Sequence, residues 1–221
     1  IIGVGGIGLL WVVMEERPST AFHNLSAVPQ RTLQDASKNG YFMLLGFDGQ
    51  GNHDPIQLGF DRKFEDSDLE RARVCLMGAD DRSAAREGAF GGVLSNWLKS
   101  SDPAAQFRSQ STSIRTWVEQ AHVSMLRYKQ WLKMPFEDWG YGEALSPNCS
   151  LILHAHRLYV AEGFAQDIEA GVDRLEADFS MWRTISSHAK TLRIKMLAVD
   201  AMTDDVTIMS GLLARPDIDE R

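Results

Sequence analysis

Three apolar runs follow one another at helical spacing between Leu151 and Leu213 of this 221-residue chain. The first run extends from Leu151 to Phe164. In the second, apolar residues recur at Val172, Leu175, Phe179, Trp182 and Ile185. In the third, they recur at Leu192, Met196, Val199, Met202, Val206, Met209 and Leu213. Steps of three or four residues place side chains on one helix face, so we expect three amphipathic helices that bury these faces on one another.

Consecutive amphipathic helices pack as antiparallel hairpins, and we place the first turn near Gly171. The predicted fold is mostly α, an N-terminal transmembrane helix followed by an array of antiparallel helical hairpins. Six side chains are predicted to form the core between the helices: Leu158, Leu175, Phe179, Trp182, Leu192 and Met196.

Further helices are predicted upstream. Apolar spacing indicates one long helix from about Gln106 to Lys133, ended by Pro135. Asp54-Pro55 and Asp102-Pro103 combine an N-cap residue with a first-turn proline, so each predicts a helix start. A short helix is expected near residues 31–37, and the apolar run 41–47 fits either a strand or a helix.

The first fourteen residues contain no charged side chain, and Glu15-Glu16-Arg17-Pro18 follows them. A helix of this length reaches only ~21 Å of a ~30 Å hydrocarbon core. Since the chain begins with Ile, we expect the rest of a membrane helix upstream. The predicted anchor contains Ile1, Gly5, Gly8, Leu10, Trp11 and Val13, with Trp11 at the interface.

Three other interpretations of this segment are a buried core helix, a cleavable signal, and a nucleotide-binding turn. Gly3, Gly5 and Gly8 spell the G-x-G-x-x-G pattern of dinucleotide sites. Only two residues precede Gly3, so a preceding strand has no room. No acidic residue lies about 20 positions beyond the last glycine, where a ribose contact is expected. The membrane anchor is therefore favoured.

This interpretation divides the chain into an anchor (1–16), a tether (17–39), a helical periplasmic domain (40–215) and a tail (216–221). The net charge of −7 makes nucleic acid an unfavourable partner. In the periplasm, Cys75 and Cys149 could form a disulfide; the alternative is two unpaired core thiols. Their wide spacing, without C-x-x-C, argues against a zinc or redox site.

Candidate chemical groups are few. His154 and His156 lie two positions apart and point to different helix faces, so they cannot share a metal without other ligands. We expect one of them to pack or hydrogen-bond in the core, and we expect Asp178 with Arg183 and Lys195 to form an ion-paired seam between helices. The acidic pairs Asp80-Asp81 and Glu137-Asp138 are typical of surface or capping positions. No catalytic residue, metal site or cofactor is predicted.

Short landmarks spread over residues 39–213 resemble a group of membrane-anchored helical periplasmic proteins of Gram-negative bacteria. They are Asn39-Gly40-Tyr41, Leu44-Leu45-Gly46-Phe47, Leu126-Arg127-Tyr128, Pro135-Phe136, His156-Arg157-Leu158-Tyr159, Leu175-Glu176-Ala177-Asp178, Trp182-Arg183, Thr191-Leu192 and Lys195-Met196. The resemblance implies an N-terminal anchor and a helical periplasmic domain, and no catalytic residues. The helix pair around Gly163–Arg183 also resembles a degenerate tetratricopeptide unit.

The anchor, the helical array and the lack of a catalytic constellation together predict an interaction protein. We expect a non-catalytic accessory, scaffold or assembly subunit of an inner-membrane complex, with other membrane-protein subunits and the lipid bilayer as partners. The alternative is a periplasmic hydrolase that acts on envelope material. Its acids would come from Asp80, Asp81, Glu137 or Asp138, and its base would be His154 or His156.

Overall fold

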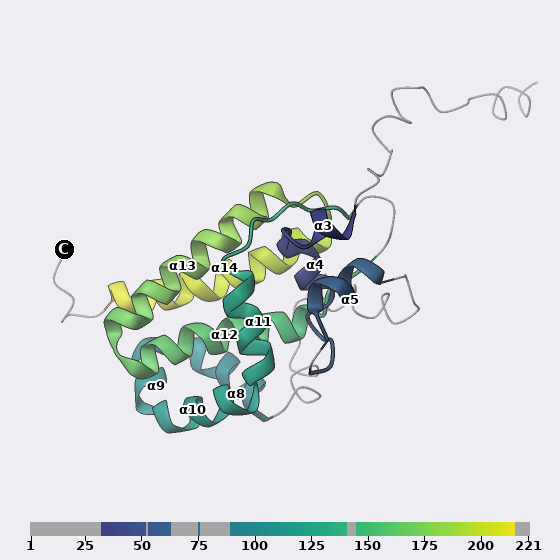
Figure 1. Ribbon diagram of the computed structural model, residues 1–221. Helices are drawn as coiled ribbons and strands as arrows, with labels where there is room; N and C mark the ends of the chain where they lie inside the picture. The colour runs from purple at the N-terminus through teal and green to yellow at the C-terminus, as the bar shows by residue number, and fades with distance from the viewer. Residues whose placement is uncertain (1–31, 52, 63–74, 76–88, 141–144, 215–221) are drawn as a thin grey trace, which may run out of the picture. The chain divides into compact units, whose positions relative to one another are not determined.

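The computed structural model describes residues 32–51, 53–62, 75, 89–140 and 145–214. The regular elements in these ranges are all α-helices (Figure 1), so the mostly α prediction is confirmed for them. They are α3 (Leu33–Ala36), α4 (Gly40–Leu45), α5 (Pro55–Asp61), α8 (Ala89–Leu98), α9 (Pro103–Ser109), α10 (Ser111–Gln120), α11 (His122–Trp131), α12 (Cys149–Gln166), α13 (Ile168–His188) and α14 (Leu192–Leu213).

The predicted anchor, residues 1–14, lies outside the described residues. Within the described ranges, the helices are too short or too polar for any of them to cross a bilayer. The compact unit begins at Arg31 and includes α3, whose Ala36 is fully buried. Residues 32–39, which the sequence places in a tether, therefore belong to this unit.

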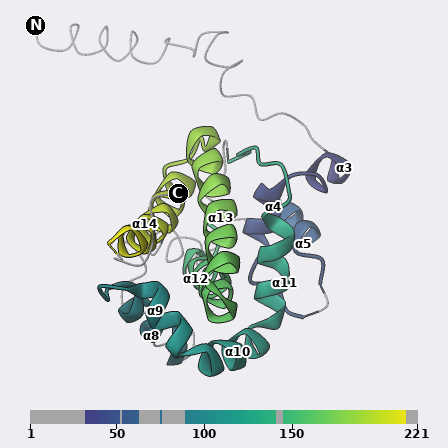
Figure 2. The same cartoon turned by 90° about the vertical axis from the view of Figure 1, so that its left-hand side faces the viewer.

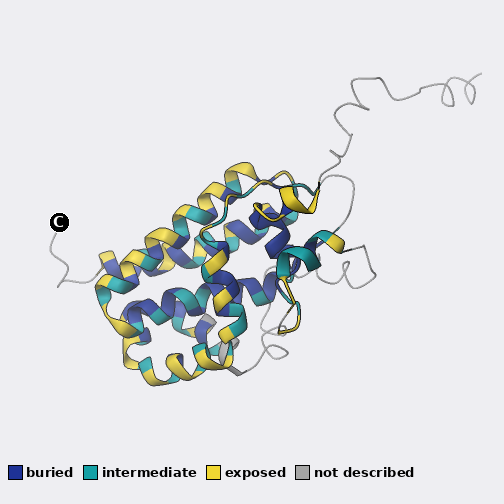
Figure 3. Cartoon of the chain, in the orientation of Figure 1, coloured by how far each residue is buried: buried dark blue, intermediate teal, exposed yellow. Residues whose placement is uncertain are grey.

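Helix α12 is the centre of the fold. It contacts α8, α9, α10, α11, α13 and α14, and most of its length is buried (Figure 3). Its sequence explains this position because apolar residues occur on every side of the helix. The Asn148 side chain accepts a hydrogen bond from the Leu151 amide at 3.1 Å and caps the helix start.

The turn between α12 and α13 lies at Asp167, four residues before the predicted turn at Gly171. Asp167 accepts a hydrogen bond from the Ala170 amide at 2.7 Å, so its side chain caps α13. Gly171 lies inside α13, and a Cβ there would come within 2.2 Å of the Phe164 ring. The glycine therefore serves close packing of the two helices, and the prediction of a glycine turn was wrong.

Helix α14 buries a different face from the one predicted. Leu192 is 65% exposed, and Val199, Val206 and Leu213 are also exposed. The buried side chains are those of Ile194, Leu197, Ala198, Ala201, Asp205, Ile208 and Leu212. This face is rich in small residues, which allow α14 to approach its neighbours closely. The prediction that this stripe faces the core was therefore wrong.

Among the six predicted core residues, the structure buries Leu158, Leu175 and Trp182. Phe179 and Met196 are half-buried. Leu192 is the clear error, because α14 has apolar residues on two faces and the spacing alone does not indicate which one faces the core.

The single long helix predicted over residues 106–133 is divided into α9, α10 and α11. The chain turns at Gln110 and Ala121, so the three helices follow the flank of α12 (Figure 2). A straight helix of this length could not keep contact with α12 along all three segments. The helix starts predicted from Asp54-Pro55 and Asp102-Pro103 are confirmed, and both aspartates cap their helices.

The run 41–47, left open between strand and helix, forms α4. Helices α4 and α5 pack backbone to backbone through Gly46 and Gly59: a Cβ on Gly59 would lie 2.0 Å from the Phe42 carbonyl oxygen. The buried Arg127 guanidinium donates to the Phe47 carbonyl at 2.8 Å and fixes the loop that follows α4.

Candidate functional site

A buried polar network joins three helices at the middle of the fold. His156 of α12 donates through Nδ1 to Oδ2 of Asp178 on α13, at 2.8 Å. The Tyr128 hydroxyl of α11 donates to Oδ1 of the same carboxylate at 2.6 Å. Trp182, one turn after Asp178, donates its indole N–H to the Tyr128 oxygen at 2.8 Å. Each of these four side chains is at most 1% exposed.

Helix α14 brings two more carboxylates to the other side of the His156 ring. Nε2 of His156 lies 3.8 Å from Asp204 and 3.9 Å from Oδ1 of Asp205, both beyond hydrogen-bonding distance. Asp204 is bound by the Arg157 guanidinium at 2.6 Å. Asp205 is fully buried, and neither of its oxygens has a hydrogen-bond partner among the described residues.

The electrostatics of the network follow from burial and from the nearby carboxylates. Burial lowers the pKa of His156, but Asp178, Asp205 and Asp204 outweigh it and raise this pKa to about 9. Burial raises the pKa of the Asp205 carboxyl to about 8, although the His156 charge opposes the shift. Burial, followed by Asp178, raises the pKa of Tyr128 well above its usual value.

This arrangement is suited to holding helices and small cations in place. Its carboxylates, imidazole and phenol lie within the core, so a polymeric substrate has no direct contact with them. A proton or a metal ion is small enough to be bound among such groups.

The candidate hydrolase groups that the structure describes, Glu137, Asp138, His154 and His156, do not converge at an exposed site. Asp138 is fully buried and accepts hydrogen bonds from the amides of Lys190 and Thr191, at 2.8 and 2.9 Å, at the start of α14. Asp138 therefore caps the start of α14, which is one of the two positions, surface or capping, that its sequence context predicts. Glu137 is joined through its backbone to the Asn39 side chain. Asp80 and Asp81 lie outside the described residues.

Both histidines of the H-x-H pair are buried in the core, where only one of them was expected. They face different surroundings. Burial, followed by the charge of Arg157, lowers the pKa of His154 to about 4. The predicted seam of Asp178 with Arg183 and Lys195 was wrong. Asp178 points into the core and pairs with His156 and Tyr128, whereas Arg183 and Lys195 are exposed.

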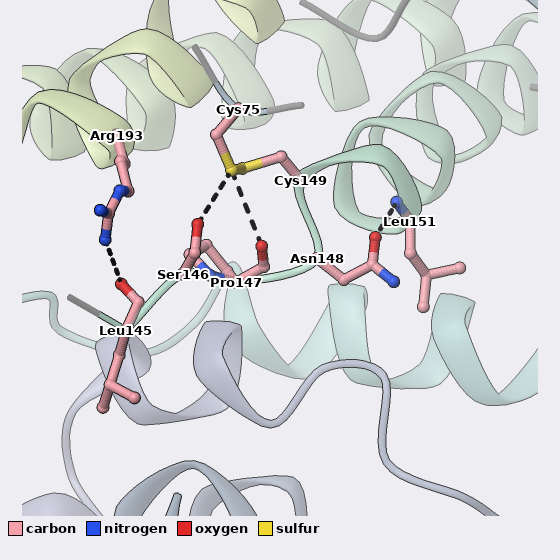
Figure 4. The surroundings of a disulfide bond; sticks show 8 residues. All are labelled: Cys75, Leu145, Ser146, Pro147, Asn148, Cys149, Leu151 and Arg193. Carbon is pink, nitrogen blue, oxygen red and sulfur yellow. Dashed lines mark hydrogen bonds between the residues drawn. A yellow bond between two sulfur atoms is a disulfide. The ribbon is translucent and has the colours of Figure 1, made fainter. Parts of the chain in front are cut away.

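Cys75 and Cys149, left open between a bridge and free thiols, are joined by a disulfide (Figure 4). Their Cα atoms are 5.4 Å apart, and the bond ties Cys75 to the first residue of α12. The Ser146 hydroxyl lies 3.5 Å from the Cys75 sulfur and can donate to it. The disulfide therefore fixes the entry of the chain into the central helix.

Comparison of the chain with protein-family models, curated proteins and solved structures gave no match. The fold and the network are therefore the basis for any functional conclusion. Sequence reasoning missed Tyr128 and Asp205 as members of the network. It assigned no role to the Tyr128 hydroxyl or to Asp205, because residues on four separate helices carry no common spacing pattern.

Proposed function

We propose that this chain acts by protein–protein interaction, as a non-catalytic accessory, scaffold or assembly subunit of an inner-membrane complex. Its main domain would lie in the periplasm, with residues 1–14 in the bilayer. The observation that supports the proposal is an apolar ridge on the outer face of α14, formed by Leu192, Val199, Val206 and Leu213. These side chains are 44% to 83% exposed.

The ridge has the spacing of a helix-pairing surface. Its members are seven residues apart, so they lie on the same side of α14 along its whole length. The half-buried Met202 and Met209 lie three residues after Val199 and Val206, and complete a heptad pattern beside the ridge. Single exposed apolar residues are common on proteins, but a continuous row is typical of an interaction site.

The order of residues in the ridge favours a second copy of this chain as its first partner. Leu-Val-Val-Leu reads the same in both directions. In an antiparallel pair of α14 helices, Leu192 would therefore face Leu213 of the other copy, and Val199 would face Val206. A C2-symmetric contact of this kind is self-complementary.

The charges beside the ridge support the same arrangement. Helices α13 and α14 run antiparallel, so the start of α13 lies beside the end of α14 (Figure 1). Arg183, in the last two turns of α13, and Lys195, in the first turn of α14, are exposed. Toward the other end, Asp173 and Glu176 are exposed. An antiparallel copy places the basic end of one chain next to the acidic end of the other.

A self-paired chain would present two copies of the helical domain to the other membrane-protein subunits of the complex. The alternative function, an envelope hydrolase, has less support. Asp138 and His156, two of its candidate groups, are buried and engaged in contacts that stabilise the fold.

Site-specific photo-cross-linking tests the proposal. A photo-reactive residue would replace Val206 in the full-length protein in native membranes, with Arg115 on the exposed side of α10 as the matched control position. We expect a product of twice the chain mass from Val206 only, cross-linked near Val199 of the second copy. A product with a different protein would overturn self-pairing. No product from Val206, or equal products from both positions, would overturn the interaction surface itself.

A further inference from the structure

The polar network contains three side chains with the chemistry and spacing of metal ligands. His156, Asp178 and Asp205 each offer one ligand atom, and these atoms all lie within 4.8 Å of one another. They come from α12, α13 and α14, so a shared ion would connect the three longest helices described. All three residues are buried.

The second observation concerns Asp205. Both of its oxygens are buried without a hydrogen-bond partner among the described residues, although Oδ1 points toward His156 at 3.9 Å from Nε2. An unpartnered buried carboxylate is costly, and such groups in proteins are normally paired or bound to a metal. The neighbouring donors do not supply a partner, because Arg157 is engaged with Asp204 and Tyr128 with Asp178. The Asp178 carboxylate is within hydrogen-bond reach of Asp205, but two carboxylates can share such a bond only if one of them keeps a proton. The pair therefore requires either that proton or a cation between the two acids.

The geometry is compatible with a single ion. Two ligand atoms on opposite sides of an ion at ~2.1 Å are ~4.2 Å apart, and closer in a tetrahedral site. The 3.9 Å between His156 and Asp205 lies within this limit, and the longest separation of 4.8 Å would require only a small side-chain rotation. The His156 ring faces Asp178 with Nδ1 and Asp205 with Nε2, and the Asp178 and Asp205 carboxylates are themselves within hydrogen-bond reach of each other.

The donor set indicates the class of ion. Two carboxylates balance the charge of a divalent cation, and an imidazole nitrogen favours first-row metals such as Zn²⁺ or Mn²⁺ over Mg²⁺ and Ca²⁺. The surrounding hydrogen bonds are of the kind that orient metal ligands: Tyr128 holds Asp178, and Trp182 holds Tyr128.

We propose that His156, Asp178 and Asp205 form a buried structural site for one divalent first-row metal ion, which locks α12, α13 and α14 together. The site is independent of the α14 ridge, because Asp205 is on the buried face of α14 and the ridge is on the exposed face.

Metal titration of the full-length protein tests this site. Chelator-treated protein in mild detergent would be titrated with ZnCl₂ or MnCl₂, with MgCl₂ as the comparison ion. We expect one equivalent of Zn²⁺ or Mn²⁺ to bind and to raise the thermal midpoint by roughly 5 °C at a hundredfold excess over the dissociation constant. Mg²⁺ should produce no comparable shift.

Two variants separate this site from zinc bound by surface histidines. Asp205→Asn keeps the side-chain size but removes the charge, and it should abolish both the binding and the shift. The matched control, Asp200→Asn on the same helix, should retain both. Absence of stoichiometric binding, or binding unchanged in Asp205→Asn, would overturn the proposal.

X-ray absorption of the zinc-loaded wild type gives a second test that needs no variant. Nitrogen and oxygen ligands that include one imidazole support the site, and two or more imidazoles contradict it.

Discussion

Nδ1 of His156 lies 2.8 Å from Oδ2 of Asp178, and this pair is enclosed by the core on all sides. It joins the middle of the central helix α12 to the middle of α13. Tyr128 and Trp182 extend the same network to α11 and back to α13. Because buried hydrogen bonds of this kind are specific in geometry, the network fixes how these helices meet.

Tyr128→Phe tests the contribution of the network to stability. The substitution removes the hydroxyl that accepts from Trp182 and donates to Asp178, so the buried Trp182 indole N–H and Oδ1 of Asp178 each lose this hydrogen bond, while Oδ2 of Asp178 keeps its bond to His156. We expect the free energy of unfolding to fall by about 2 kcal/mol in urea titration. Tyr159→Phe, on the half-buried neighbouring tyrosine, is the control and should cost less. Equal losses in both variants would show that the hydroxyl of Tyr128 has no special role.

The disulfide between Cys75 and Cys149 closes a loop with a sequence separation of 74. In the chain-entropy model, a disulfide that closes a loop of this length stabilises the folded protein by ~4 kcal/mol. We therefore expect a reductant to lower the thermal midpoint of the wild type. The double variant Cys75→Ala, Cys149→Ala should already be lowered and should not respond to the reductant. A wild type that is insensitive to reduction would contradict this contribution.

Glu162 connects three helices, because it binds Lys129 of α11 at 2.8 Å and also contacts Arg174 of α13. Burial raises the pKa of Glu162, but hydrogen bonds and charges from Lys129 and Arg174 outweigh it and lower the pKa below 4.5. A lowered carboxyl pKa means that the unfolded chain takes up the proton first as the pH falls. The stabilisation is therefore complete above about pH 4.5 and is lost as the pH falls through the folded-state pKa.

Unfolding measurements at several pH values check this contribution. At pH 7 we expect the wild type to be more stable than Glu162→Gln by ~1 kcal/mol, since the group is partly exposed. This difference should shrink as the pH falls below 4.5. Glu119→Gln, at an exposed position of α10, is the control and should show little difference at any pH. A difference that stays constant down to pH 3 would contradict the ion-pair account.

The fold could be predicted from the sequence where local chemistry decides the outcome. Asp54 and Asp102 cap helices through their own side chains, and the apolar pattern located α12, α13 and α14. The breaks at Gln110 and Ala121 were not predictable in this way. They depend on contact with α12, which is distant in sequence.

The network was beyond prediction for a related reason. Asp178 lies between Leu175 and Trp182 on the buried face of α13, and Asp205 lies on the buried face of α14, so an acid on an apolar helix face was the available signal. Their common partner His156 is on another helix, and only the packing of α12, α13 and α14 brings it to them. The error at Leu192 has the same origin. Helix α14 has apolar residues on two sides, and its packing buries the face that includes Leu197, Ala198 and Ala201 and exposes the other.

The interaction account is tested most directly by native mass spectrometry of the full-length protein extracted from membranes in mild detergent. The comparison is between the wild type, a Val199→Lys, Val206→Lys variant of the ridge, and Thr116→Lys at an exposed position of α10. The account predicts paired chains for the wild type and for Thr116→Lys, and single chains for the ridge variant. A wild type with one copy per particle, or a ridge variant that stays paired, would contradict it.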